Sequence, residues 1–163
     1  MAKKICLYGI FAALCITAGY IEHLVNFDFI APGIKLGLAN SVAMMLIVLG
    51  DIKGAFAVNT VRIILSVLLF STPLALVYSL SGGLLSFAVM VPVSKIKSVS
   101  IYGMSILGAE AHNLAQLACG SIFLGTGIWY YSGILITAAL LCGILTAAVS
   151  KLLLKKLKTD ILL

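Results

Sequence analysis

Three ionisable side chains lie in the middle of apolar segments of this 163-residue chain. Arg62 lies in GAFAVNTVRIILSVLLFS, and Glu110 and His112 lie in IYGMSILGAEAHNLAQLACGSIF. If these segments cross a bilayer, placing each such group at its centre costs about 2.5–3.5 kcal/mol. A chain this apolar is expected to carry them only where they meet one another, water or a ligand. They therefore mark the predicted working centre.

Further polar residues accompany these groups. Asn59, Arg62 and Ser66 share one face of their segment, within about 60° of arc on a helix. The polar residues of the other segment, within about 160° of arc, are Glu110, His112, Asn113 and Gln116. At 1.5 Å per residue, Arg62 and Glu110 lie about 12 and 15 Å from the inner ends of their helices, so the clusters are at similar depth. Two interpretations remain open: an internal Arg62–Glu110 ion pair that specifies packing, or a polar ligand cavity lined by both clusters.

Signals of catalysis and of metal binding are missing. Asp28, Asp51 and Asp160 are isolated and form no acidic cluster of the kind that holds a metal–diphosphate group. No phosphate-cradling Gly–Lys loop, serine elbow or H-E-x-x-H motif occurs. Glu110 and His112, two residues apart, point about 200° apart on a helix and chelate one ion poorly. The sequence predicts no enzyme activity, no cofactor and no metal site.

The composition identifies the structural class that must position these residues. Hydrophobic residues make up 63% of the chain, charged residues 10%, and the mean hydropathy is +1.23, whereas soluble domains are about 45–50% apolar and about 25% charged. Six apolar stretches, most of them near the ~20 residues that a spanning helix needs, cover residues 5–26, 34–50, 54–71, 73–94, 100–122 and 131–153. We predict an all-α integral membrane protein, a six-transmembrane-helix bundle that forms one domain over residues 1–163.

The lysines indicate the orientation in the membrane. With six spans and a cytoplasmic N-terminus, nine lysines fall inside and only Lys35 falls outside, as positive-inside topology requires. The nine are Lys3, Lys4, Lys53, Lys95, Lys97, Lys151, Lys155, Lys156 and Lys158. This placement accounts for the net charge of +6 without nucleic acid, for which no groove-reading module is visible. The predicted location is the cytoplasmic (inner) membrane of a bacterium, with several spans and both termini cytoplasmic.

Two segments at the outer side carry further candidate residues. In APGIKLGLAN, Pro32 and Gly33 break the chain before it re-enters the membrane. The helix start that follows, together with Lys35, forms a possible anion-binding corner above Asn40; alternatively, Lys35 extends to the outer headgroups. Trp129 belongs to an aromatic cluster that forms either an interfacial belt or a cover over an outward-facing pocket.

Small residues recur on two of the predicted helices. Gly9, Ala13 and Thr17 are spaced by four residues in the first stretch. This seam either packs inside the bundle or docks a partner membrane subunit, since small residues allow close helix approach. The fourth stretch carries a similar set on one face: Ser79, Gly82, Gly83 and Ser86. Tight packing or close approach of a ligand to the backbone explains the second set.

Four sequence features together resemble a known family: PGIKLGLAN, Arg62 in the third stretch, SLSGGLLS and AEAHNLAQ. They are similar, over essentially the whole chain, to the Gx transporter family, also labelled heptaprenyl diphosphate synthase component I. The six-span plan also resembles, at the level of the fold, the substrate-binding S components of energy-coupling factor (ECF) vitamin transporters. That likeness implies capture of a small molecule from outside, with the first helix facing the coupling subunit and the first loop gating the site. The synthase label implies a membrane partner in making a polyprenyl diphosphate for menaquinone.

We therefore predict a membrane-embedded substrate-binding subunit of an ECF-type transporter for a vitamin-like or anionic solute. The alternatives are a non-catalytic membrane subunit of heptaprenyl diphosphate synthase in isoprenoid and menaquinone synthesis, and a purely structural membrane protein. The predicted substrate-binding residues are Lys35, Asn40, Asn59, Arg62, Glu110, His112, Asn113, Gln116 and Trp129, and the predicted partner interface is Gly9, Ala13 and Thr17. The predicted partners are the lipid membrane, a small-molecule substrate, a transmembrane coupling subunit and its ATPases, but no nucleic acid.

Overall fold

The computed structural model describes residues 2–25 and 37–160. Within these ranges the chain forms six α-helices and one 3₁₀ helix, with no strand. In chain order they are α1 (Ala2–Val25), α2 (Asn40–Val48), α3 (Ile52–Phe70), α4 (Pro73–Val93), α5 (Ile101–Leu124), η1 (Thr126–Tyr131) and α6 (Ser132–Asp160). The prediction of an all-helical membrane protein with six helices is confirmed.

Four segments are long and apolar enough to cross a membrane. They are Lys4–Glu22, Ile52–Phe70, Pro73–Val93 and Thr126–Lys156, so the chain is a multi-pass membrane protein by helix length and hydropathy. The remaining two helices differ from this group: α5 has 24 residues but carries a polar cluster, and α2 has only 9 residues. Six complete spans stay a prediction.

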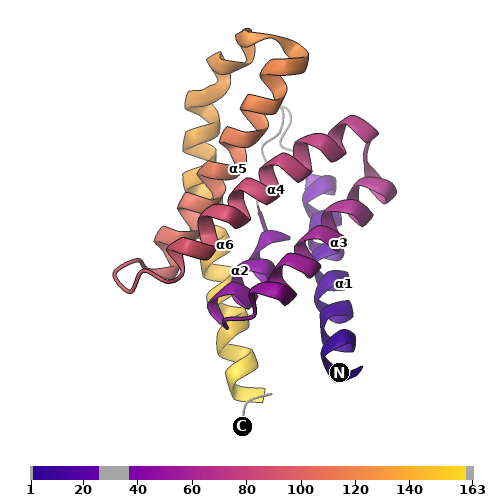
Figure 1. Ribbon diagram of the computed structural model, residues 1–163, viewed down its shortest axis with the longest axis vertical. Coiled ribbons are helices and arrows are strands. Elements are labelled where there is room, and N and C mark those ends of the chain that lie inside the picture. The colour runs from indigo at the N-terminus through magenta and orange to yellow at the C-terminus, as the bar shows by residue number, and fades with distance from the viewer. Residues whose placement is uncertain (1, 26–36, 161–163) are drawn as a thin grey trace.

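Figure 1 shows how the helices are arranged in one bundle. α5 and α6 form a long antiparallel pair, α4 packs against α5 and α3, and α1 packs mainly on α3. The short α2 packs on α3 and α6. The start of α1 and the end of α6 lie at the same end of the molecule, an arrangement that agrees with the expected common side for both termini.

Side-chain caps fix where three helices begin. Asp51, Thr72 and Ser100 each accept a hydrogen bond from the backbone N–H three residues later, at 3.0, 3.4 and 3.1 Å. Such caps satisfy donors that have no partner inside the helix. Pro73 at the start of α4 adds a fixed backbone angle where its missing N–H costs nothing. These residues lie in the breaks that were visible between the apolar stretches.

The start of α2 differs from the sequence prediction. Gly37 has a φ of 78°, in the left-handed region that favours glycine, and the N–H of Asn40 donates to the Gly37 carbonyl at 2.9 Å. Thr146 of α6 donates to the same carbonyl at 3.2 Å, so α6 holds this turn. The helix therefore begins at Asn40, not directly after the proline. Lys35 lies outside the described residues, so the predicted corner of Lys35 and a helix start stays a prediction.

Candidate functional site

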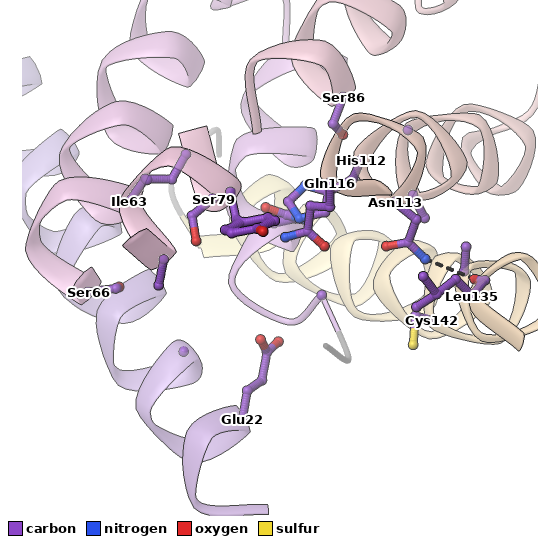
Figure 2. A pocket seen from close by; sticks show the side chains of 18 of the residues that line it. Glu22, Ile63, Ser66, Ser79, Ser86, His112, Asn113, Gln116, Leu135 and Cys142 are labelled. Atoms are coloured by element: carbon purple, nitrogen blue, oxygen red, sulfur yellow. Dashed lines mark hydrogen bonds between the residues drawn. The ribbon is translucent and has the colours of Figure 1, made fainter. Parts of the chain in front are cut away.

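A cavity of about 560 Å³ lies inside the bundle and is lined by residues from all six α-helices. Its volume suits a small organic molecule, since ligand sites commonly measure about 300–1,000 Å³. The polar lining residues are Glu22, Asn40, Arg62, Ser66, Ser71, Tyr78, Ser79, Ser86, Ser105, His112, Asn113, Gln116, Cys142 and Thr146. Figure 2 shows the Glu22 carboxylate directed into this space from α1.

Arg62 carries the positive charge of this site. It lies deep in the bundle, yet part of its surface remains accessible from the cavity. Its Nη2 donates to Asn40 Oδ1 at 2.7 Å and to Asn59 Oδ1 at 2.8 Å, and both acceptors are neutral amides. Its Nε is buried and has no hydrogen-bond partner. The guanidinium is therefore held at the cavity wall by two neutral amide oxygens, and the Glu22 carboxylate lines the same cavity.

Glu110 does not contact Arg62, contrary to one interpretation of the sequence. Ala109 and His112 of α5 line the cavity, but Glu110 does not. Glu110 follows Ala109 and is rotated from it by about 100° around the helix. The hydrogen bonds of Arg62 go to Asn40 and Asn59 instead. Similar depth in the membrane does not determine which way a side chain faces.

The glycine pair of α4 allows two side chains to approach its backbone. A Cβ atom at Gly82 would lie 2.7–2.9 Å from three ring atoms of His112, and one at Gly83 would lie 2.5 Å from Ile63 Cδ1. His112 comes from α5 and Ile63 from α3, so α4 packs tightly between them. The sequence offered two explanations for these glycines: tight helix packing, or close approach of a ligand to the backbone. The structure shows tight helix packing at both positions.

The two amides of α5 also face the cavity. Asn113 Nδ2 donates to the Leu135 carbonyl of α6 at 2.9 Å, and this bond is drawn in Figure 2. Gln116 lines the cavity and forms no hydrogen bond with the described residues. Asn113 therefore joins α5 to α6 while Gln116 is available to a ligand.

Trp129, one of the predicted outer residues, does not line the cavity. Trp129 lies in η1 with 40% of its surface exposed, and the neighbouring Ile128 lines the cavity in its place. Lys35 lies outside the described residues. An aromatic cover by Trp129 is therefore not present in this arrangement.

The predicted partner seam faces away from the bundle. Gly9, Ala13 and Thr17 are all exposed on α1, and a Cβ atom at Gly9 would meet nothing within 4 Å. Thr17 Oγ1 donates to the carbonyl of Ala13 at 3.0 Å, a bond within the helix itself. Of the two interpretations of this seam, packing inside the described bundle is excluded.

The sequence interpretation missed Glu22 and Tyr78 as cavity residues. Glu22 Oε1 accepts a hydrogen bond from the Ala39 N–H at 3.3 Å, just before α2. The Tyr78 hydroxyl and the Ser66 hydroxyl are buried without a hydrogen-bond partner in the described part of the chain. A carboxylate at the outer end of the first apolar stretch was the available signal for Glu22. Ser66 was recognisable from its position on the Arg62 face.

The described residues include no group of three or more His, Cys, Asp or Glu side chains that could hold a metal ion. Residues 11–153 match the family described as heptaprenyl diphosphate synthase component I. This match spans most of the chain, and the chain belongs to that family. No curated protein and no solved structure matches it.

Proposed function

We propose that this member of the heptaprenyl diphosphate synthase component I family is the substrate-binding subunit of an ECF-type transporter that takes up a small anionic, vitamin-like solute. The observation that carries the proposal is the buried guanidinium of Arg62 at the wall of a cavity of about 560 Å³. Its hydrogen bonds end on the neutral oxygens of Asn40 and Asn59. An anionic group entering the cavity would add a charged partner for the guanidinium.

Further polar atoms in the cavity support a binding role over a purely structural one. Arg62 Nε, the Ser66 hydroxyl and the Tyr78 hydroxyl are buried without a partner. Buried polar groups in proteins nearly always have hydrogen-bond partners. Polar residues that serve only to join helices would be expected to form hydrogen bonds with other parts of the protein. Asn113 does so with the Leu135 carbonyl. A ligand with hydrogen-bonding groups would satisfy the remaining atoms.

The exposed seam of α1 supports assembly with another membrane subunit. Membrane helices associate closely where small residues allow their backbones to approach, and Gly9, Ala13 and Thr17 are exposed on one helix. In the proposed transporter this seam contacts the transmembrane coupling subunit, and ATPases bind to that subunit from the cytoplasm. Substitution of Gly9 by leucine would prevent a helix of the coupling subunit from approaching α1 closely.

A second candidate function is supported by the family description. A non-catalytic membrane subunit of heptaprenyl diphosphate synthase would also use an exposed membrane face, but its partner would be a prenyl diphosphate synthase. The two candidates therefore differ in which protein co-purifies: a coupling subunit with ATPases, or a prenyl diphosphate synthase. A catalytic role is not part of either proposal.

Native mass spectrometry of protein purified in mild detergent tests ligand binding. The wild-type chain is expected to retain a small molecule, and Arg62→Gln is expected to lose it. Lys53→Gln is the matched control, because it removes a positive charge from the same helix at an exposed position. Retention of the same molecule by Arg62→Gln, at the wild-type level, would contradict binding at this cavity.

Co-purification from the native membrane tests whether the seam of Gly9, Ala13 and Thr17 binds the coupling subunit. Gly9→Leu is expected to lose the coupling subunit and to keep the bound small molecule, since Gly9 does not line the cavity. Ala57→Leu adds the same bulk at an exposed position of α3 and should keep both. Capture of a prenyl diphosphate synthase, with no ATPase and no bound small molecule, would favour the second function.

A further inference from the structure

Glu110 lies at the level of the middle of a membrane-spanning segment. Its helix, α5, packs antiparallel to α6, and α6 contains a segment that is long and apolar enough to cross a membrane. A Cβ atom at Gly143 would lie 2.8 Å from Ile106 Cα. Further along α5, Asn113 donates to the Leu135 carbonyl at 2.9 Å. Glu110 lies between Ile106 and Asn113 in the chain, so it is level with the central part of that segment.

Glu110 shares a face of α5 with exposed apolar residues. It follows Leu107 by three positions and precedes Leu114 by four, and residues at these spacings are neighbours on a helix. Leu107 is 46% exposed and Leu114 is 53% exposed, and Ala118, one turn further, is exposed as well. Glu110 itself is partly exposed and does not line the cavity. These four residues form the Glu110 face, which meets either lipid or another helix at this level of a membrane.

No described group balances the charge of Glu110. Within residues 2–25 and 37–160, Glu110 forms no hydrogen bond and no ion pair, and no other charge acts on it. Its side chain is too short to reach water, because the hydrocarbon core is about 30 Å thick and its middle lies about 15 Å from either surface. A charged side chain exposed to lipid at this depth is costly, and such groups usually pair with one another. The Glu110 face therefore requires a partner.

The charge of Glu110 indicates the chemistry of that partner. A carboxylate forms its strongest hydrogen bonds with arginine or lysine, and the attraction of opposite charges increases in a low-dielectric interior. A second copy of this chain offers no such group at this level among the described residues. Arg62 lines the cavity. The first lysine of α6 is Lys151, whose Nζ lies 5.9 Å from the centroid of the Tyr102 ring, at the start of α5. The partner is therefore a different protein.

We infer that the Glu110 face binds a transmembrane helix of a different membrane protein, and that this helix carries a lysine or an arginine near its middle. The cation pairs with the Glu110 carboxylate. Leu107 and Leu114 contact apolar side chains of the partner helix, and Ala118 leaves room for its backbone. This face is separate from the seam on α1, because α1 packs mainly on α3 whereas α5 packs on α4 and α6. The inference does not depend on the proposed ligand binding, since Glu110 does not line the cavity.

Synthetic peptides test this pairing with the purified chain in phosphatidylcholine vesicles. Each peptide is a leucine helix of about 20 residues, long enough to span the membrane, with arginine, glutamine or leucine at its middle. A photo-reactive amino acid in place of Leu114 reports contact as the yield of cross-linked peptide. The arginine peptide is expected to give roughly 3- to 30-fold more product than the leucine peptide, as polar contacts between membrane helices would produce. Moving the arginine by about seven residues, or about 10 Å along the helix, should remove this advantage.

Variants assign the preference to Glu110. Glu110→Gln keeps the shape of the side chain but removes its charge, so the arginine and leucine peptides should then give similar yields. Glu110→Asp keeps the charge and should keep the order of the yields. The photo-reactive amino acid in place of Leu68 is the matched control, because Leu68 is 74% exposed on another helix, α3, and all peptides should react equally there. A glutamine peptide that matches the arginine peptide would overturn the cationic partner.

In the native membrane, the same photo-reactive amino acid in place of Leu114 identifies the partner. The expected product joins this chain to a different protein, at a transmembrane segment with a lysine or an arginine near its middle, and Glu110→Gln should lose it. Replacing that cation by glutamine in the partner should have the same effect. Native mass spectrometry of Glu110→Gln should find the same small molecule as in wild type, which separates this inference from the proposed function. The absence of a product, a product that contains only a second copy of this chain, or a product that Glu110→Gln retains would overturn the inference.

Discussion

The imidazole of His112 lies directly against the backbone of Gly82, so that a Cβ atom at position 82 would be 2.7 Å from His112 Cε1. His112 belongs to α5 and Gly82 to α4, and both helices line the cavity. The missing side chain of one residue thus provides the space for the ring of the other. The polar face of α5 is positioned by this contact.

Gly82→Ala is expected to displace the His112 ring and to destabilise the bundle. Adding a methyl group to a packed interior commonly costs about 1–3 kcal/mol, which exceeds the gain of roughly 1 kcal/mol from replacing glycine inside a helix. The unfolding temperature in detergent should fall. Gly9→Ala is the matched control, because nothing lies within 4 Å of its added Cβ, and it should be neutral or stabilising. An equal response of the two variants would contradict the close contact.

Arg62 is expected to couple energetically to Asn59 and not to Glu110. Asn59 is 5% exposed and accepts a hydrogen bond from Arg62 at 2.8 Å. A double-mutant cycle of Arg62→Met with Asn59→Leu should therefore give an interaction energy of about 0.5–3 kcal/mol. The cycle of Arg62→Met with Glu110→Gln should be additive within about 0.5 kcal/mol. Strong coupling to Glu110, measured by unfolding in detergent, would contradict the arrangement of this site.

The helices and their ends were predictable from the sequence because local features determine them. Apolar stretches of membrane length were separated by residues such as Asp51, Thr72 and Ser100, which cap the helices that follow. The start of α2 was not predictable, because the turn at Gly37 is held by Thr146, which lies 109 positions later in the chain. A local pattern contains no information about such a partner.

The directions of the polar side chains were harder to predict than their depth. In a membrane helix both the lipid-facing and the interior-facing sides are apolar, so the hydrophobic pattern does not identify the inner face. For this reason both interpretations of Glu110 placed it at the working centre, as a partner of Arg62 or as a cavity residue, although it does not line the cavity. For the same reason Glu22 was not recognised as a cavity residue. Arg62 itself was predictable, since a cation inside an apolar segment requires an explanation.

Cysteine labelling is expected to place the connection between α2 and α3 and the connection between α4 and α5 in the cytoplasm. In a background without native cysteines, Lys53→Cys and Lys97→Cys should react with a membrane-impermeant reagent only after the cells are permeabilised. Tyr130→Cys in η1 is the control for the outer side, because Tyr130 is 94% exposed, and it should react in intact cells. Reaction of Lys53→Cys in intact cells would contradict the predicted orientation.

Acidification is expected to remove a contact between α1 and the start of α3. Tyr8 donates a hydrogen bond to Asp51 Oδ2, and the Gly54 N–H donates to Asp51 Oδ1 at 3.0 Å. The bond from Tyr8, the bond from Gly54 and the nearby charge of Lys4 lower the pKa of Asp51 from its ordinary value. All three favour the ionised carboxylate in the folded chain. The contact therefore stabilises the fold most where Asp51 is charged.

Asp51→Asn tests this contribution, because asparagine still caps a helix but carries no charge. A carboxyl whose pKa is lower in the folded state stabilises the protein fully above its unfolded pKa, about 3.9 for aspartate. This stabilisation is lost as the pH falls through the folded-state value. The unfolding temperature of Asp51→Asn should thus lie below that of wild type at neutral pH, and the difference should shrink below about pH 4. Ser100→Ala removes a cap that does not titrate, which accepts from the Gly103 N–H at 3.1 Å, and its difference from wild type should not depend on pH. A constant difference for Asp51→Asn across the same range would show that the charge of Asp51 does not stabilise this end of the bundle.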